Sequence, residues 1–294
     1  GIRDHAESRG RGDVYKRQES AAHLLGSIGE SDSRALERGN ATGYRAGDVV
    51  GNSGLDFRHE AHLRWKKGGR NIVIDVSGQE VEVVGEVEAV PGGRILLTLD
   101  LDLQRAGEEA FRSSEPGTPD HRGALVALDP RNGEVLALVS QPAYDPNAFA
   151  GGIGTDDWNA LLSDDNRPLR NRAIAGQYPP GSTYKAVVAL AGLSEGVLDP
   201  DETVFCPGEY RLGRHTYRCW KREGHGEVDL DAAMLGSCDV YFYHLGVELG
   251  IDTIAQYASL LGLGRPTGVD LQGALGGLVP SKEWKESARG DRWL

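Results

Sequence analysis

The sequence predicts an α/β protein with a small β-rich module at its N-terminal side and a larger mixed domain after it. Apolar and charged residues alternate with period two before position 90, which is typical of half-exposed strands. Patterns with helical spacing dominate after position 180. The cluster Pro91-Gly92-Gly93 lies between these regions and breaks both kinds of element. We therefore expect a tail at 1–18, the module at 19–91 and the larger domain at 92–294.

Composition limits the class of protein. The 294 residues allow one large domain or a large and a small one, and an apolar share of 39% is enough for a core. The net charge of −12 argues against nucleic acid or an anionic membrane surface as the main partner, because both attract a basic face. No run of about 18 apolar residues is present that could span a bilayer.

The N-terminal module is expected to be built mainly of strands. Residues 1–18 are nearly all charged or small and show no period, which favours an unstructured or foreign tail. After it, period-two patterns predict strands within His23–Glu30, Asn71–Val76 and Glu80–Val90, and Gly54–Trp65 is expected to form a short helix.

The larger domain begins with a strand at Ile95–Leu99 and a helix that starts at Asp100 or Asp102, with an aspartate as its N-cap. Two apolar runs flank the turn Asp129–Gly133 and predict a hairpin. The polar stretch Gln141–Tyr178 is long enough to suggest a functional loop. Four helices should follow: Ser182–Glu195, Leu230–Leu235, Val240–Leu249 and Thr253–Leu261.

The segment Tyr178–Lys185, which reads YPPGSTYK, carries the first candidate for chemistry. It places Ser182 in the first turn of an apolar helix and Lys185 one turn later, so the lysine nitrogen can reach the serine hydroxyl. A serine becomes a good nucleophile only when a base takes its proton. Burial and the positive end of the helix dipole both favour a neutral lysine that could act so. The alternative is a surface lysine after an N-cap serine.

The second candidate is Ser237-Cys238-Asp239, between two predicted helices. A hydroxyl and a carboxylate in one tight turn could complete a proton relay with Ser182 and Lys185. An ordinary helix cap before Val240 is the alternative.

Together these segments resemble the class B penicillin-binding proteins, most closely their elongation-type group. S-x-x-K followed by S-x-N or S-x-D is the signature of penicillin-binding proteins and serine β-lactamases, and the wording of the other segments narrows the resemblance to class B. The segments YPPGSTYK, GSCDVYFYHLG, ALDPRNGEVLALVSQPAYDPN, TLDLDLQ and GDVVGNSGLDFRHE occur in the order of the family. The resemblance runs collinearly from about Ala21 to Trp284.

The resemblance implies a penicillin-binding, β-lactamase-like transpeptidase domain on a β-rich pedestal. It further implies a peptidoglycan D,D-transpeptidase of cell-wall elongation that acts on stem peptides and is bound by β-lactams. Such an enzyme works at the periplasmic face of the inner membrane, with a membrane glycosyltransferase as its partner. Ser182 would be the nucleophile and Lys185 the acylation base. Ser237 would relay a proton, and Asp239 would hold the Lys185–Ser237 network. The backbone N–H of Ser182 would form half of an oxyanion hole.

Two departures from the family pattern matter. Asp239 stands where asparagine is commoner, and the third motif, K-[ST]-G, does not follow Ser237. The family's membrane anchor is also not recognisable before the module. We therefore expect a truncated transpeptidase domain, an internal fragment that is itself nearly inactive. A β-lactam sensor, a serine β-lactamase and a non-catalytic scaffold of the elongation complex are the alternative functions.

The three cysteines and one histidine suggest a structural zinc site beside the serines. Cys206, Cys219 and Cys238 are the only cysteines of the chain, and His225 lies among them. Three thiolates and one imidazole form a closed tetrahedral set for Zn²⁺. A Cys206–Cys219 disulfide with Cys238 free is one alternative in an oxidising compartment. Three unrelated thiols with a surface histidine are the other.

Overall fold

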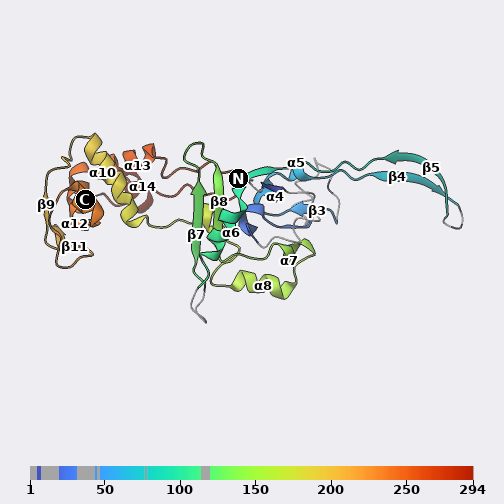
Figure 1. Ribbon diagram of the computed structural model, residues 1–294, viewed down its shortest axis with the longest axis horizontal. Coiled ribbons are helices and arrows are strands. Elements are labelled where there is room, and N and C mark those ends of the chain that lie inside the picture. The colour runs from blue at the N-terminus through green and yellow to red at the C-terminus, as the bar shows by residue number, and fades with distance from the viewer. Residues whose placement is uncertain are drawn as a thin grey trace. The chain divides into compact units, whose positions relative to one another are not determined.

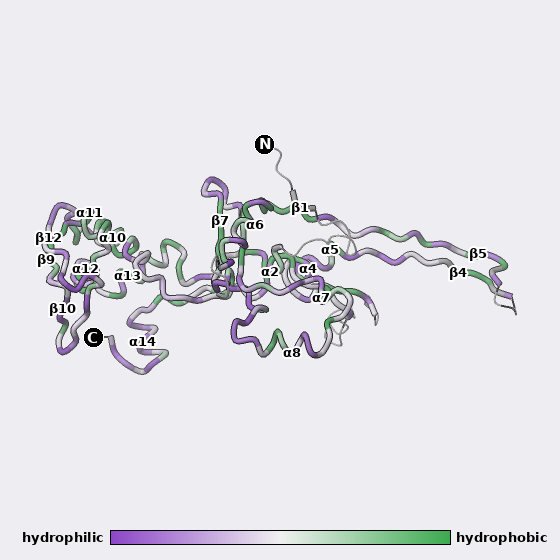
Figure 2. Tube along the Cα trace, turned by 60° about the horizontal axis from the view of Figure 1, so that its bottom comes forward, coloured by the Kyte–Doolittle hydropathy of each residue, from purple (hydrophilic) through white to green (hydrophobic). Residues whose placement is uncertain are grey.

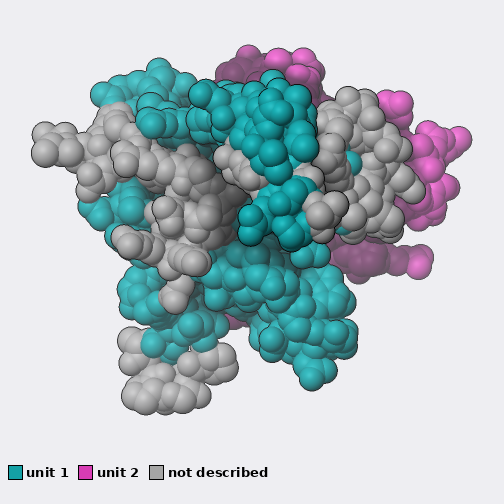
Figure 3. Space-filling model, turned by 90° about the vertical axis from the view of Figure 1, so that its right-hand side faces the viewer, with its two compact units in different colours: residues 1–176, 269–274 teal, residues 177–268, 275–294 magenta. Residues whose placement is uncertain are grey.

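The computed structural model describes residues 5–7, 20–31, 44, 47–75, 77, 79–113 and 120–293. The chain divides into two compact units (Figure 3). Unit 1 consists of residues 1–176 and 269–274, and unit 2 of residues 177–268 and 275–294. Within the described part of the chain, no helix is long and apolar enough to cross a membrane.

Unit 1 mixes short strands and helices, and each pair of strands is antiparallel: β1 with β6, β2 with β3, β4 with β5, and β7 with β8. Its elements are β1 (His5–Glu7), α2 (Ala22–Leu25), β2 (Ile28–Glu30), β3 (Val49–Gly51), α4 (Gly54–Arg58), α5 (Glu60–Leu63), β4 (Gly69–Ile74), β5 (Glu80–Val87), β6 (Leu96–Asp100), α6 (Leu101–Glu109), β7 (Gly123–Leu128), β8 (Val135–Gln141), α7 (Asn147–Ala150), α8 (Thr155–Ser163) and α9 (Arg172–Ala175).

The predicted elements of unit 1 are confirmed where the hydrophobic pattern extends over a long segment. Strands β4 to β8 and helix α6 lie where expected, and the Asp100 carboxylate caps α6 by accepting a hydrogen bond from the Leu103 N–H at 3.0 Å. The predicted strand His23–Glu30 is wrong in its first half, which forms α2. The predicted helix 54–65 is interrupted at His59, and the polar stretch 141–178 contains three helices that the sequence analysis missed.

The β4–β5 hairpin forms a two-stranded arm along which hydrophobic and hydrophilic residues alternate (Figures 1 and 2). Six of its apolar side chains are exposed, and among the described elements no third strand pairs with this hairpin: Ile72, Val73, Val81, Val83, Val84 and Val87 are between 42% and 67% exposed. The alternation that predicted these strands is therefore present without a buried face.

A fully buried glutamine joins helix α6 to strand β8. The Gln104 side chain donates to the Leu138 carbonyl at 3.1 Å and accepts from the Leu138 N–H at 2.8 Å. It also donates to Glu108, whose other contacts are the Ser20 hydroxyl and the Ala21 N–H, both at 2.7 Å. These bonds satisfy polar groups inside the core formed by Ala21, Leu24, Leu99, Leu138 and Leu271.

Unit 2 is largely helical, with two small antiparallel pairs of strands, β9 with β12 and β10 with β11. Its elements are a 3-10 turn η2 (Gly181–Tyr184), α10 (Lys185–Ser194), β9 (Val204–Cys206), β10 (Glu209–Leu212), β11 (His215–Arg218), β12 (Gly226–Val228), α11 (Leu230–Leu235), α12 (Asp239–Leu249), α13 (Ile251–Leu260) and α14 (Lys282–Arg289). The four helices predicted after position 180 are confirmed within one or two residues, except that the first begins as η2.

The core of unit 2 surrounds α10 and α12. Ala191, Val240 and Tyr241 are almost completely buried, and the three cysteines belong to the same core. The carboxylate of Asp229 caps α11 by accepting a hydrogen bond from the Ala232 N–H at 2.8 Å. This core fixes the end of α11, the start of α12 and the start of α10 relative to one another.

The long segment of unit 1 ends at Gly176, whereas the sequence predicts a boundary at Pro91. The segment 92–176 packs with the N-terminal module because α6 and β8 contact its residues Ser20 to Leu24. In the segment expected to be an unstructured tail, His5–Glu7 forms β1 and pairs with β6. Residues 8–18 lie outside the described part of the chain.

Candidate active site

The two residues of the first motif lie at the junction of η2 and α10. Ser182 is in the 3-10 turn, and Lys185 is the first residue of α10. The two prolines before Gly181 prevent a regular helix from starting earlier, so the chain enters α10 through this tight turn. The side chain of Lys185 is 12% exposed, and its Nζ lies 5.6 Å from the centre of the Phe242 ring.

The second motif forms the turn between α11 and α12. Ser237 has a φ of +49°, a left-handed conformation that costs a serine roughly 1–2 kcal/mol. Hydrogen bonds hold the turn: the Ser237 N–H donates to Met234, and the Cys238 N–H donates to the Ala233 carbonyl at 2.8 Å. The turn therefore places Ser237 just before α12 and Asp239 as its first residue.

One continuous set of hydrogen bonds links the two motifs. Lys185 Nζ donates to the Ser237 carbonyl at 2.8 Å, to Ser237 Oγ at 3.0 Å and to Asp239 Oδ1 at 2.6 Å. Ser237 Oγ donates in turn to Ser182 Oγ at 3.0 Å. All three protons of an ammonium thus have an oxygen acceptor. The structure brings together the four residues that the sequence analysis proposed as catalytic.

The order of these contacts corrects one expectation. The sequence analysis places Lys185 in direct reach of the Ser182 hydroxyl. Among the described residues, the hydroxyl of Ser237 lies between them and contacts both. The three donors of the lysine nitrogen are instead taken by the Ser237 carbonyl, the Ser237 hydroxyl and Asp239 Oδ1.

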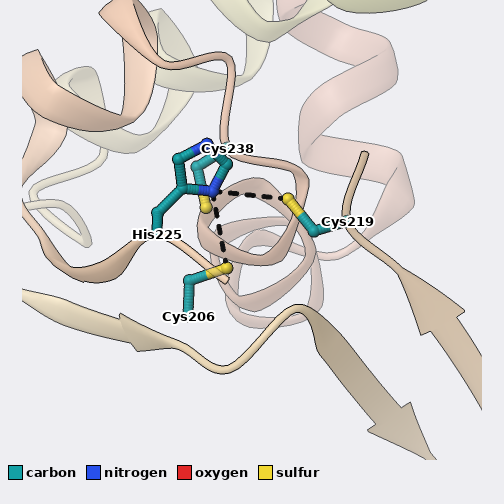
Figure 4. Close-up of side chains that lie close together, drawn as sticks. All are labelled: Cys206, Cys219, His225 and Cys238. Atoms are coloured by element: carbon teal, nitrogen blue, oxygen red, sulfur yellow. Dashed lines mark hydrogen bonds between the residues drawn. The ribbon is translucent and has the colours of Figure 1, made fainter. Parts of the chain in front are cut away.

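The four predicted metal ligands converge beside this turn (Figure 4). Their ligand atoms lie within 4.8 Å of one another, and the three cysteines are buried. The Nδ1 atom of His225 lies 3.7 Å from Cys206 Sγ and 3.5 Å from Cys219 Sγ. All three thiols are free, so the disulfide alternative is not formed, and the alternative of unrelated thiols is wrong because the side chains cluster.

Two glycines allow the loops that carry these ligands to approach. Gly208 and Gly224 have φ values of +92° and +81°. A Cβ at either position would lie 2.1 Å from a backbone oxygen, that of Arg222 or of Cys206. Only glycine fits both the conformation and the space. Pairing of Cys206 with Gly226 in the β9–β12 ladder then places Cys206 next to His225.

The surroundings shift the pKa values of two of the thiols, Cys219 and Cys238, in opposite directions. Burial acts to raise the pKa of the Cys219 thiol, but the backbone N–H groups of Asp239, Lys221 and Val240 donate to its sulfur and lower the pKa below the ordinary value. Burial raises the pKa of Cys238 to about 12, and the neighbouring Cys206 and Cys219 add to the effect. A thiolate at Cys219 is thus stabilised by the start of α12 itself.

A residue that the sequence analysis missed also touches the catalytic set. The backbone N–H of Trp220 donates to Asp239 Oδ2 at 3.0 Å, and its indole N–H donates to the Gly236 carbonyl at 3.0 Å. Its position directly after Cys219 is the only signal in the sequence, and that signal does not indicate contact with a residue 19 positions away.

Comparison with known protein families identifies the family to which this chain belongs. Residues 123–291 match the penicillin binding protein transpeptidase domain, and residues 9–97 match the penicillin-binding protein dimerisation domain. The chain belongs to the penicillin-binding proteins. The match to the dimerisation domain covers most of the β-rich module, and the match to the transpeptidase domain includes both motifs of the site.

Individual penicillin-binding proteins are similar over almost the whole chain. The peptidoglycan D,D-transpeptidase MrdA of Escherichia coli is 37% identical over 95% of the chain and 45% of its own length, and that of Acinetobacter baumannii is 35% identical over 95% and 41%. The structure of Helicobacter pylori PBP2 in complex with MreC has a TM-score of 0.82 at 32% identity and covers 95% of this chain and 50% of its own. Pseudomonas aeruginosa PBP2 has a TM-score of 0.75 at 38% identity, covering 93% and 55%. The chain thus spans about half the length of these relatives.

Proposed function

We propose that the complete gene product containing this chain is a peptidoglycan D,D-transpeptidase that acts through a serine acyl-enzyme in cell-wall elongation. The observation that carries the proposal is the hydrogen-bonded series from Ser182 through Ser237 to Lys185 and Asp239. A nucleophile, a relay and a base in contact are the parts that acyl transfer needs. The similarity to MrdA transpeptidases supports the same reaction.

In the first step Ser182 Oγ attacks the carbonyl carbon of the penultimate D-alanine in a stem peptide. With Lys185 neutral, both hydrogen bonds of the relay reverse, so that Ser182 Oγ donates to Ser237 Oγ and Ser237 Oγ donates to the lysine nitrogen. The proton of Ser182 then passes to Ser237 Oγ while the proton of Ser237 passes to Lys185. The C–N bond of the terminal D-alanine then breaks, and the protonated lysine returns the proton to the leaving amine through the same relay. The product is an ester of Ser182 and a free D-alanine.

In the second step an amine of a neighbouring stem peptide attacks the Ser182 ester. The relay takes a proton from that amine, the ester C–O bond breaks, and the proton returns to Ser182. Asp239 keeps the lysine in contact with Ser237 throughout, because its Oδ1 accepts from Lys185 at 2.6 Å.

Labelling of the complete gene product with a fluorescent penicillin tests this function. The wild type should form a stable adduct at Ser182, and Ser182→Ala should form none. Lys185→Ala should slow acylation by about 10²–10⁴-fold, the usual contribution of a positioned base. Rapid loss of the label would indicate a β-lactamase, an unlabelled wild type would indicate a scaffold, and normal labelling of Ser182→Ala would exclude this site.

We also propose that Cys206, Cys219, His225 and Cys238 hold a structural zinc ion. Zn–S bonds of about 2.3 Å and a Zn–N bond of about 2.0 Å in a tetrahedron separate nitrogen from sulfur by about 3.5 Å. The distances from His225 Nδ1 to two sulfurs are 3.7 and 3.5 Å, which supports this geometry. The ion would supply no catalytic chemistry. It would tie the loop 206–225 to the turn that carries Ser237 and Asp239.

Metal analysis of the purified chain checks this site. One equivalent of zinc per chain is expected, and Cys219→Ser or His225→Ala should reduce it strongly. His215→Ala, which changes an exposed histidine of the same hairpin region, is the control and should keep full occupancy. A zinc-free wild type purified without chelators contradicts the proposal.

We further propose that the complete protein works at the periplasmic face of the inner membrane with a membrane glycosyltransferase. Two similar structures support such partners: one is the complex of Helicobacter pylori PBP2 with MreC, and the other concerns the structural coordination of polymerization and crosslinking by a peptidoglycan synthase complex. Affinity purification of the tagged gene product from its host tests this, and recovery without a glycosyltransferase would contradict it.

A further inference from the structure

We propose that Trp220 is a positioning residue that clamps the turn 236–239 and thereby sets the rate of acylation of Ser182. This inference rests on the proposed function, since the rate in question is that of the proposed acyl transfer. Trp220 contacts residues on both sides of Ser237: Gly236 before it and Asp239 after it.

The first part of the clamp fixes the carboxylate of Asp239. Its Oδ1 accepts from Lys185 at 2.6 Å, and its Oδ2 accepts from the backbone N–H of Trp220 at 3.0 Å. A carboxylate held at both oxygens cannot rotate about its Cβ–Cγ bond without losing one partner. The Trp220 N–H therefore decides which oxygen faces the lysine and where that oxygen lies.

The second part of the clamp fixes Trp220 itself. Its indole Nε1 donates to the carbonyl of Gly236 at 3.0 Å, and its ring packs edge-on against His225 at 5.5 Å between centroids. The side chain is nevertheless 64% exposed, so burial of apolar surface accounts for little of its role. Its directed hydrogen bond adds to the contacts of the neighbouring Cys219 in holding the backbone N–H of Trp220 against Asp239.

The turn needs such support because Ser237 adopts the left-handed conformation, with φ +49°. Inside the turn, the N–H groups of Gly236, Ser237 and Cys238 donate to carbonyls of α11, and from outside it Lys185 donates to the Ser237 carbonyl. Trp220 adds one contact at each end from outside the turn. Because Ser237 Oγ is the link between Lys185 and Ser182, a small rotation of this turn would lengthen both hydrogen bonds of the relay.

The variants Trp220→Phe and Trp220→Ala in the complete gene product test the inference. Phenylalanine keeps an aromatic ring and removes the indole donor, whereas alanine removes both. Phe205→Ala is the matched control, because Phe205 is also an exposed aromatic residue, 59% against 64%, next to a thiol of the same cluster. Phe205 makes no side-chain hydrogen bond to the catalytic residues.

The measurement separates the acylation rate constant from the non-covalent binding constant of a penicillin, and records the burst amplitude, zinc content and Tm. We expect the rate constant to fall about 3- to 10-fold in Trp220→Phe, which is the usual loss for one hydrogen bond. In Trp220→Ala the rate constant should fall further. Binding, amplitude and zinc content should stay at the wild-type level, and Phe205→Ala should match the wild type in all of them. A lower amplitude with an unchanged rate constant, or an equal effect of Phe205→Ala, would overturn the inference.

A second measurement does not depend on activity. In the ¹⁵N-tryptophan-labelled chain, the backbone amide of Trp220, assigned with Trp220→Phe, should be protected from hydrogen exchange. Asp239→Ala should abolish that protection and leave the indole N–H of Trp220 protected. Fast exchange of this amide in the wild type would refute the clamp, whereas a protected amide in a protein that no penicillin acylates would refute only the proposed function and the kinetic part of this inference.

Discussion

Asp239 has two partners that both need an acceptor, and this explains why aspartate suits the position in this chain. One oxygen accepts from Lys185 and the other from the Trp220 N–H. An asparagine has a single acceptor oxygen, so it can satisfy one of these donors and must turn its own NH₂ group toward the other. The carboxylate thus serves two contacts that the amide cannot serve together.

We therefore predict that Asp239→Asn slows acylation of the complete protein by about 10- to 100-fold, the loss expected for a hydrogen bond to a charged group. Stopped-flow measurement with a chromogenic cephalosporin provides the rate constant. Asp231→Asn, at an exposed position of α11, is the control and should leave the rate unchanged. An Asp239→Asn enzyme as fast as the wild type would mean that the second contact of the carboxylate has no role.

His23 makes unit 1 sensitive to acid. Its ring lies in the core, Nε2 contacts the Pro168 carbonyl at 2.7 Å, and burial lowers its pKa from 6.5 to about 4. The folded state therefore binds fewer protons than the unfolded state between these values. We therefore expect the contribution of His23 to stability to be fully present well above pH 6.5 and to be lost as the pH falls toward 4, by about 2 kcal/mol at pH 5.

Urea unfolding of unit 1, followed at several pH values, checks this expectation. The free energy of unfolding should decrease between pH 7 and pH 5 in the wild type, and His23→Gln should reduce that slope because the glutamine does not titrate. An equal slope in both proteins would show that other groups cause the acid sensitivity.

At the scale of elements, buried polar contacts join α6 to β8 in addition to the apolar core of unit 1. Gln104 on α6 satisfies both backbone groups of Leu138 on β8. Helix α6 therefore cannot shift along the strand without leaving a buried N–H or C=O unpaired.

We predict that Gln104→Leu destabilises unit 1 by about 2–4 kcal/mol, because a leucine of similar size leaves the two Leu138 groups unsatisfied. Chemical denaturation measures the change, and Gln141→Leu, on the end of β8, is a more exposed comparison. A loss below about 0.5 kcal/mol in Gln104→Leu would show that water replaces the glutamine at no cost.

At the scale of the whole molecule, the catalytic residues and the thiol cluster all belong to unit 2, and unit 1 contains none of them. Removal of the proposed zinc should therefore act on one unit alone. A ligand present at 100 to 1,000 times its dissociation constant contributes about 3–4 kcal/mol to the state that binds it.

We predict that a chelator lowers the Tm of unit 2 by more than about 10 °C, since 1 kcal/mol corresponds to several degrees for a unit of about 100 residues. The transition of unit 1 should not move. Differential scanning calorimetry of the chain with and without chelator shows both transitions, and Cys206→Ser should make unit 2 insensitive to the chelator. A chelator effect on unit 1 would place the metal elsewhere.

The sequence by itself determined the elements with a clear period and the residue types of the site. The apolar run of β8 and the apolar stripes of α10 to α13 report burial that repeats along the chain, whereas the alternation in β4 and β5 indicated strands without a buried face. The collinear motifs identified the family, and the spacing of Ser182 and Lys185 indicated a nucleophile with a nearby base.

Tertiary structure alone decided how these residues meet. The short helices α2, α7 and α9 have too few turns to show a period, and packing rather than propensity stabilises them. Two features of the site depend on contacts between residues far apart in the sequence. Ser237 lies between Lys185 and Ser182, and Trp220 contacts both ends of the turn around Ser237. Such contacts are set by the packing of α10, α11 and α12 in one core, and no local pattern records them.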